Sequence, residues 1–138
     1  MTTTFSRPKG MCLASLVTAI NVLVESGFAI AALVEPQALL PAGSIPTRAS
    51  FIFALYAGAR VLPLALIALV AIFKRATAAL LILGTLAGAI QLLDAGIGAF
   101  QHDLSKSIGP LVIGVIQLIV VLRLNRSMQS RSGTRSNA

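Results

Sequence analysis

Hydrophobic residues fill four long stretches of the chain, and polar residues gather between them. The stretches are Met11–Val34, Phe51–Phe73, Thr77–Phe100 and Ile108–Leu124. A helix needs about 20 apolar residues to cross the hydrocarbon core of a bilayer, and a helix satisfies its own backbone polar groups there. The pattern therefore predicts an all-α polytopic membrane protein, an antiparallel bundle of four transmembrane helices that forms one membrane domain over residues 1–138.

The composition supports a membrane protein and excludes several other classes. Hydrophobic residues make up 57% of the chain and the mean hydropathy is +0.91, which is too apolar for an ordinary soluble domain. The net charge of +7 would suggest nucleic acid in a soluble protein, but here the basic residues flank apolar stretches. We therefore expect contact with the lipid bilayer and no nucleic-acid partner. Cys12 is the single cysteine, and neither a pair of histidines nor a nucleotide-binding glycine motif is present, so we expect no metal and no cofactor.

The distribution of Lys and Arg predicts the orientation. Eight basic residues flank one side of the four stretches, namely Arg7, Lys9, Lys74, Arg75, Arg123, Arg126, Arg131 and Arg135. The other side has Arg48 and Lys106. Both termini are therefore expected in the cytoplasm, with the protein in the cell membrane if the host is bacterial. The polar tail from about residue 126 is expected to be disordered, and the proline-rich loop 35–48 to hold a short turn or lid.

Each predicted span has one face of polar or small residues at helical spacing. In the first span, Thr18, Asn21 and Glu25 share a face. The corresponding sets in the other spans are Tyr56, Arg60 and Pro63; Gly84, Gly88, Gln91, Asp94 and Gly98; and Gly114 and Gln117. Polar groups within a membrane normally face the interior of a bundle, so these faces are expected to meet.

The depth of the polar groups is also similar. Counted from the outer ends of the stretches, Glu25, Arg60, Gln91 and Gln117 each lie nine residues into their span. At about 1.5 Å per residue this is about 13 Å, close to the midplane of a core about 30 Å thick. We therefore expect these residues to form one layer, with Asp94 about one turn nearer the outer surface.

The charges of this layer point to acid–base chemistry. It contains the carboxyl groups of Glu25 and Asp94 and the permanently charged guanidinium of Arg60. We expect one acid, with Asp94 favoured, to pair with Arg60 and the other to carry a proton, a division that suits an acid and a base. Glu25, Asp94 and Arg60 are thus the candidate catalytic residues. The candidate substrate-binding residues are Asn21, Tyr56, Gln91, Gln117 and His102.

A purely structural role is the alternative for the same residues. An Arg–Asp pair and glutamines can fix the register of helices, and His102 can be a solvated loop residue. The segment "GTLAG" at Gly84–Gly88 matches the GxxxG pattern, which is compatible with close packing inside one chain and with dimerisation.

The arrangement resembles the DoxX-like group of small four-helix membrane proteins. The resemblance covers residues 11–124 and includes an Arg in the second span ("YAGARVLPLALIAL"), an Asp late in the third ("GAIQLLDAGIGAF") and a compact fourth span. It implies the four-helix membrane fold and a link to quinone or sulfur redox chemistry, while Glu25 matches no part of the group's pattern. The chain is also similar to small multidrug transporters in having a Glu in the first of four short helices. However, it lacks their aromatic-rich spans, and Arg60 would oppose a cationic substrate.

Three functions follow as hypotheses. The first is a membrane-embedded isomerase, cyclase or epoxide-opening hydrolase that acts on a small apolar molecule by carboxylate acid–base catalysis. The second is a non-catalytic quinone-binding or lipid-binding protein, or an accessory subunit of a membrane partner such as a redox enzyme. The third is a proton-coupled carrier of small molecules, which would need alternating access and a homodimer.

Overall fold

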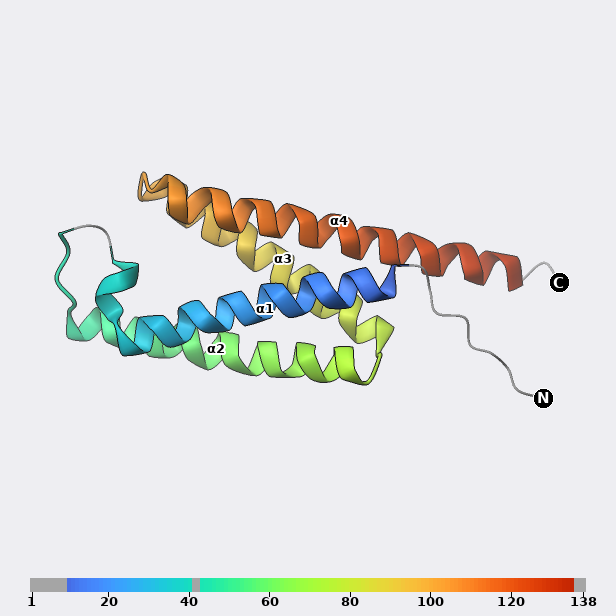
Figure 1. Ribbon diagram of the computed structural model, residues 1–138, viewed down its shortest axis with the longest axis horizontal. Helices are drawn as coiled ribbons and strands as arrows, with labels where there is room; N and C mark the ends of the chain where they lie inside the picture. The colour runs from blue at the N-terminus through green and yellow to red at the C-terminus, as the bar shows by residue number, and fades with distance from the viewer. Residues whose placement is uncertain (1–9, 41–42, 136–138) are drawn as a thin grey trace.

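A computed structural model shows an all-helical protein, and it describes residues 10–40 and 43–135 (Figure 1). The helices are α1 (Met11–Val34), the short 3₁₀ helix η1 (Pro36–Leu39), α2 (Arg48–Phe73), α3 (Thr77–Phe100) and α4 (Leu104–Arg135). Four of them are long and apolar enough to cross a membrane. The prediction of four membrane-spanning helices is thus consistent with the structure, and η1 supplies the short turn expected in the loop 35–48.

Two helices begin earlier than predicted because polar side chains cap them. Thr47 precedes α2, and its hydroxyl accepts a hydrogen bond from the Ser50 backbone N–H at 3.1 Å. The Ser50 hydroxyl accepts one in return from the Thr47 N–H at 2.9 Å, which completes a capping box. Asp103 caps α4 in a similar way, so that α4 begins at Leu104 instead of Ile108.

The fourth helix also ends later than predicted. The predicted span stopped at Leu124 with a disordered tail from about residue 126, whereas α4 continues to Arg135. The added segment contains no proline, and its Arg, Met and Gln residues favour a helix, whereas its serines and Gly133 do not. Extending an existing helix needs no new nucleus, so a polar segment can continue it without an apolar face. The predicted tail beyond Arg135 lies outside the described residues, as do Arg7 and Lys9.

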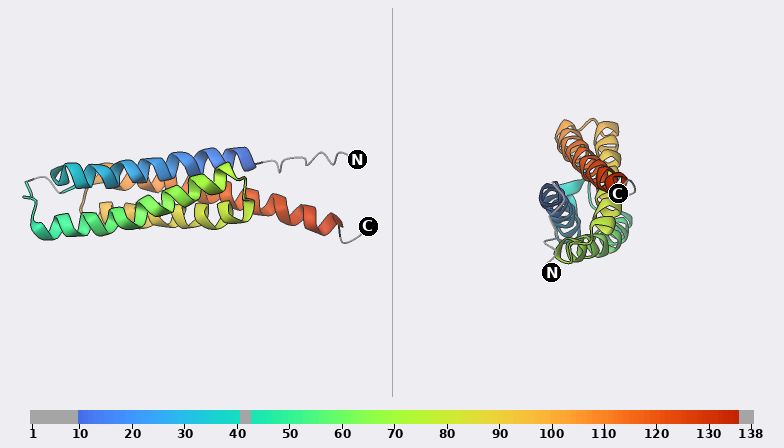
Figure 2. Two further views of the ribbon diagram at one scale, coloured as in Figure 1. Left: turned by 90° about the horizontal axis from the view of Figure 1, so that it is seen from below. Right: turned by 90° about the vertical axis from the view of Figure 1, so that its right-hand side faces the viewer.

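The helices form two closely packed pairs. α1 packs mainly on α2, and α3 packs mainly on α4. The end-on view in Figure 2 shows the α3–α4 pair above the α1–α2 pair. We call the end with Met11, Phe73 and Thr77 the basal end, and the end with η1 and the α3–α4 turn the loop end. In Figure 1, α2 and α3 lie close together at the basal end, where a short turn joins them, and apart at the loop end.

Small residues let the two pairs approach each other. Val22 of α1 forms a buried cluster with Ala65 and Ala68 of α2 and Ala87 of α3. A second cluster at the basal end joins α1, α3 and α4 and consists of Met11, Ala14, Leu80, Val120 and Leu124. Helices in lipid associate by close packing of small side chains, which fits the many alanines in these contacts.

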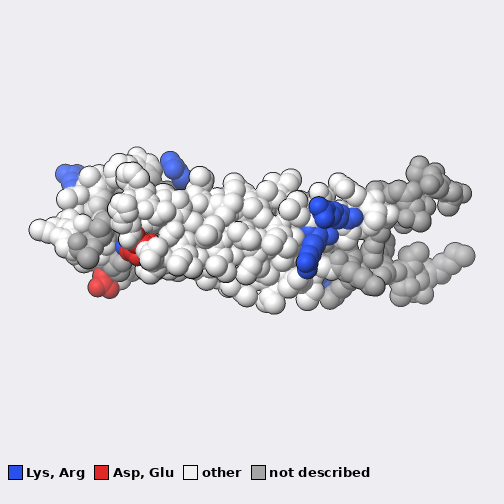
Figure 3. Space-filling model, turned by 90° about the horizontal axis from the view of Figure 1, so that it is seen from above, with Lys and Arg blue, Asp and Glu red and all other residues white. Residues whose placement is uncertain are grey.

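The outside of the bundle is apolar over most of its length. Large hydrophobic side chains such as Leu16, Leu66, Ile82 and Leu122 are more than half exposed. On the face shown in Figure 3, an uncharged belt separates basic side chains near the termini from charged groups toward the opposite end. This distribution suits a protein whose sides contact hydrocarbon.

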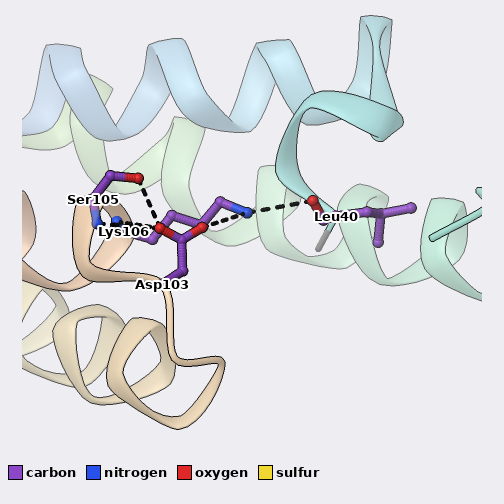
Figure 4. A network of polar contacts seen from close by, with 4 residues as sticks. All are labelled: Leu40, Asp103, Ser105 and Lys106. Atoms are coloured by element: carbon purple, nitrogen blue, oxygen red, sulfur yellow. Dashed lines mark hydrogen bonds and ion pairs between the residues drawn. The ribbon is translucent and has the colours of Figure 1, made fainter. Parts of the chain in front are cut away.

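A polar network joins the loop connections at the loop end (Figure 4). The carboxylate of Asp103 accepts hydrogen bonds from the hydroxyl of Ser105 at 2.7 Å and from its backbone N–H at 3.1 Å. Lys106 Nζ lies 3.3 Å from Asp103 Oδ2 and donates to the Leu40 carbonyl at 3.4 Å. The network therefore attaches the segment after η1 to the start of α4. The Ser105 hydroxyl and the Lys106 backbone N–H lower the pKa of Asp103 by hydrogen bonding to its charged form.

Candidate functional site

Among the described residues, five polar side chains are buried inside the bundle. They come from three helices and are Thr18, Asn21 and Glu25 of α1, Gln91 of α3 and Gln117 of α4, each at most 7% exposed. The predicted polar faces of α1 and α4 therefore point inward, and so does that of α3 except at Asp94, which is exposed. We call these five residues the polar ladder.

Two interhelical hydrogen bonds join residues of the polar ladder. Gln117 Nε2 donates to Thr18 Oγ1 at 2.8 Å, and Gln91 Nε2 donates to Asn21 Oδ1 at 2.7 Å. Each bond joins residues far apart in the sequence, so each ties α1 to the α3–α4 pair. In lipid such interhelical bonds contribute about 0.6–2 kcal/mol each, which makes them useful for fixing helix register.

The predicted single layer is wrong, because Gln117 does not lie beside Glu25. Its partner Thr18 precedes Glu25 by seven residues, which is about 10 Å along α1. The error came from counting depth in the fourth span from Ile108. Because α4 begins at Leu104, Gln117 lies 13 residues from its start, or about 20 Å. The buried groups thus form a column along α1 and not a layer across the bundle.

Glycines allow the glutamines to reach α1. A Cβ atom on Gly84 would lie 2.8 Å from Gln117 Nε2 and 3.2 Å from Thr18 Oγ1. A Cβ on Gly114 would lie 3.1 Å from both Gln91 Cβ and the carbonyl oxygen of Gly88. The glycine pattern at Gly84–Gly88 therefore serves close packing inside this chain, one of the two interpretations open from the sequence.

The polar ladder ends in a buried acid, Glu25, which has the Gln91 side chain as a neighbour. Both carboxyl oxygens of Glu25 are buried and make no hydrogen bond among the described residues. One turn toward the basal end, Asn21 Nδ2 is a buried donor that is also unused. Asp94 lies close enough to Glu25 for the two carboxyl groups to interact electrostatically. Leaving a buried polar group unpaired is costly, so an acceptor and a donor on one helix face form a plausible binding position for a polar group of a ligand.

The predicted residues of α2 do not join the polar ladder. Arg60 is exposed, Tyr56 is 61% exposed, and no ion pair joins Arg60 to Glu25 or Asp94 within the described part of the chain. The expected Arg60–Asp94 pair is thus not formed inside one chain. The interior face of α2 consists instead of Gly58, Ala65, Ala68 and Ala71. The regular spacing of these small residues could have identified this face from the sequence.

The remaining candidates lie at the edge of the bundle. Asp94 is on α3 next to the buried Gln91 face but is itself exposed. His102 is exposed in the α3–α4 turn, with a positive φ of 55°. No group of three or more His, Cys, Asp or Glu that could hold a metal ion is present among residues 10–40 and 43–135.

A groove lies on the outside of the α3–α4 pair. Its volume is about 530 Å³, and it is lined by Leu81, Ile82, Thr85, Leu86, Ala89, Val121, Leu122 and Asn125. None of the candidate residues lines it. No protein-family model, no curated protein and no solved structure matches this chain.

Proposed function

We propose that this chain is a small multi-pass membrane protein in which Glu25 performs acid–base chemistry on a small apolar substrate that enters from the bilayer. The observation that carries the proposal is the Glu25 carboxyl group, which is 7% exposed, lies in a membrane-spanning helix and has no partner among the described residues for either oxygen. Such a group costs stability, and acidic residues within spans commonly mark a pathway or a site.

The proposed topology is an antiparallel bundle with both termini in the cytoplasm, which places the protein in the cell membrane if the host is bacterial. Lys74 and Arg75 lie at the basal end together with the start of α1 and the basic part of α4. Cytoplasmic segments of membrane proteins carry an excess of Lys and Arg, so the basal end is assigned to the cytoplasm.

The neighbours of Glu25 suggest how the acid works. The free amide hydrogens of Asn21 can donate to an oxygen atom of the substrate while Glu25 gives or takes a proton. Asp94 supplies a second carboxyl group nearby, which can receive the proton that the substrate loses. An isomerisation of this kind needs only proton transfers, so the site requires no cofactor.

Carbodiimide labelling tests whether Glu25 is a reactive acid in an apolar site. Dicyclohexylcarbodiimide enters membranes and modifies protonated carboxyl groups, and intact-protein mass spectrometry detects the adduct. We expect one adduct on the wild type at neutral pH, its loss in Glu25→Gln and its retention in Glu35→Gln. Glu35 is the matched control, because it is an exposed Glu at the end of α1.

Native mass spectrometry of protein extracted from its own membrane then tests for a substrate. We expect a small apolar molecule on the wild type and on Glu35→Gln, and its loss from Glu25→Gln. An empty wild type that also fails to react with the carbodiimide would contradict the proposal and favour a structural subunit. Retention of the molecule without turnover would favour a binding subunit instead of an enzyme.

A further inference from the structure

Arg60 and Asp94 carry opposite charges and are exposed well inside α2 and α3. Arg60 is the 13th of the 26 residues of α2, and Asp94 is the 18th of the 24 residues of α3. Charged residues inside spans almost always face a protein interior or a polar cavity and pair with each other. The surface that carries these two residues is therefore a poor lipid-facing surface.

Arg60 of α2 and Asp94 of α3 each lie on the exposed part of a helix stripe that is covered nearer the basal end. Ala87 of α3 is buried in the cluster shared with α1 and α2, and Asp94 lies two turns further along the same stripe but is exposed. On α2, Ala71 is buried, Leu64 is half-buried and Arg60 is exposed, and these three follow helical spacing. On these two stripes cover is lost toward the loop end, where α2 and α3 diverge in Figure 1, whereas Gly58 of α2 and Gly98 of α3 stay buried on neighbouring stripes.

The depths of the two charges are compatible with a pair. Arg60 is at the midpoint of α2, and Asp94 is about five residues beyond the midpoint of α3, toward the loop end, which is about 8 Å. A long Arg side chain reaches toward the membrane surface and can cover much of this difference. Ala57 and Pro63, one turn to either side of Arg60, are also exposed and are not bulky, so another helix can approach closely.

We infer that a second copy of this chain covers this surface, so that Arg60 of each subunit pairs with the partner's Asp94. The inferred face contains a positive group from α2 and a negative group from α3. A two-fold axis along the membrane normal in front of that face places each positive group opposite a negative one, giving two identical pairs in a closed dimer. Because Asp94 interacts with Glu25, the partner's Arg60 brings a cation to the two acids that a single chain does not provide. The dimer would form whether or not Glu25 acts as a catalyst.

Crosslinking between two differently tagged copies tests the pairing directly. Cys12, which is exposed, is first replaced by Ser, and Arg60→Cys is placed in one copy and Asp94→Cys in the other. A short bifunctional thiol reagent applied to membranes that contain both copies should give a covalent dimer with both tags. The inference is overturned if crosslinks form only when both cysteines are in the same copy, since Arg60 and Asp94 then pair within one chain.

Native mass spectrometry gives a second readout that needs no introduced cysteine and no crosslinking reagent. We expect a dimer in the wild type and in Arg48→Gln, a matched control in which an exposed Arg outside the proposed pair is changed. Arg60→Gln and Asp94→Asn should each weaken the dimer by about tenfold or more, because each change removes both pairs. The exchange Arg60→Asp with Asp94→Arg should restore it. A monomeric wild type, or variants as dimeric as the control, would overturn the inference.

Discussion

At the scale of single residues, small side chains determine which polar groups can reach one another inside this bundle. Gln91 and Gln117 reach α1 only because glycines on α3 and α4 leave room beside them. The sequence identified the glutamines and the glycines as one face of each helix. It did not show which glutamine bonds to which residue, because that depends on where α4 begins and how it packs against α1.

Gly98 gives the clearest prediction at this scale. A Cβ atom there would lie 2.5 Å from the backbone carbonyl carbon and oxygen of Lys106, and backbone cannot move aside as a flexible side chain does. Gly98→Ala should therefore destabilise the protein by about 1–3 kcal/mol. Gly96 is the matched control, since nothing lies within 4 Å of a Cβ at that position.

Thermal unfolding of the two glycine variants in the same detergent measures the difference. Gly96→Ala should be neutral or slightly stabilising, because Ala favours a helix over Gly. Equal stability of Gly98→Ala and Gly96→Ala would show that α3 and α4 are not in close contact at this turn.

At the scale of elements, the main discrepancy concerns α2. Its polar residues Tyr56 and Arg60 suggested the interior face, but Gly58, Ala65, Ala68 and Ala71 form it. Polarity is a good guide to the interior in α1, α3 and α4, where amides and hydroxyls bond across the bundle. It fails in α2 because helices in lipid also pack closely through small residues. In α2 the polar residues and the small residues lie on different faces.

The start of α4 provides a test of capping by Asp103. Asp103→Ala removes the acceptor of the Ser105 and Lys106 backbone N–H groups, so α4 should fray and the midpoint of thermal unfolding should fall by a few degrees. Glu35→Ala, a change of an exposed acid in the other loop region, should have no such effect. An unchanged midpoint in Asp103→Ala would contradict the capping role.

The same residue predicts a dependence on pH. The pKa of Asp103 is lowered from its ordinary 3.8, chiefly by the Ser105 hydroxyl, so the folded state favours the charged form. The stabilisation by charged Asp103 is complete at pH values above its ordinary pKa. It is lost as the pH falls through the lowered pKa of the folded state. The difference in unfolding midpoint between wild type and Asp103→Ala should be constant from pH 7 to 5 and shrink only below about pH 4.

At the scale of the whole molecule, the orientation proposed from basic residues can be tested by labelling. In a Cys12→Ser background, Ile45→Cys lies in the loop before α2 and Ala76→Cys in the turn before α3. An impermeant maleimide added to intact cells should label the cysteine at position 45, and should label that at position 76 only after permeabilisation. The reverse pattern would invert the proposed topology.

The number of spans and the inward faces of α1, α3 and α4 could be predicted from the sequence, because hydropathy and helical spacing are local properties of a chain. The resemblance to DoxX-like proteins and the chemistry of Glu25 stay predictions. Only the tertiary structure decided that the polar groups form a column and that Arg60 and Asp94 are exposed instead of paired. Both depend on how far each helix is rotated and tilted, which contacts between small residues distant in the sequence determine.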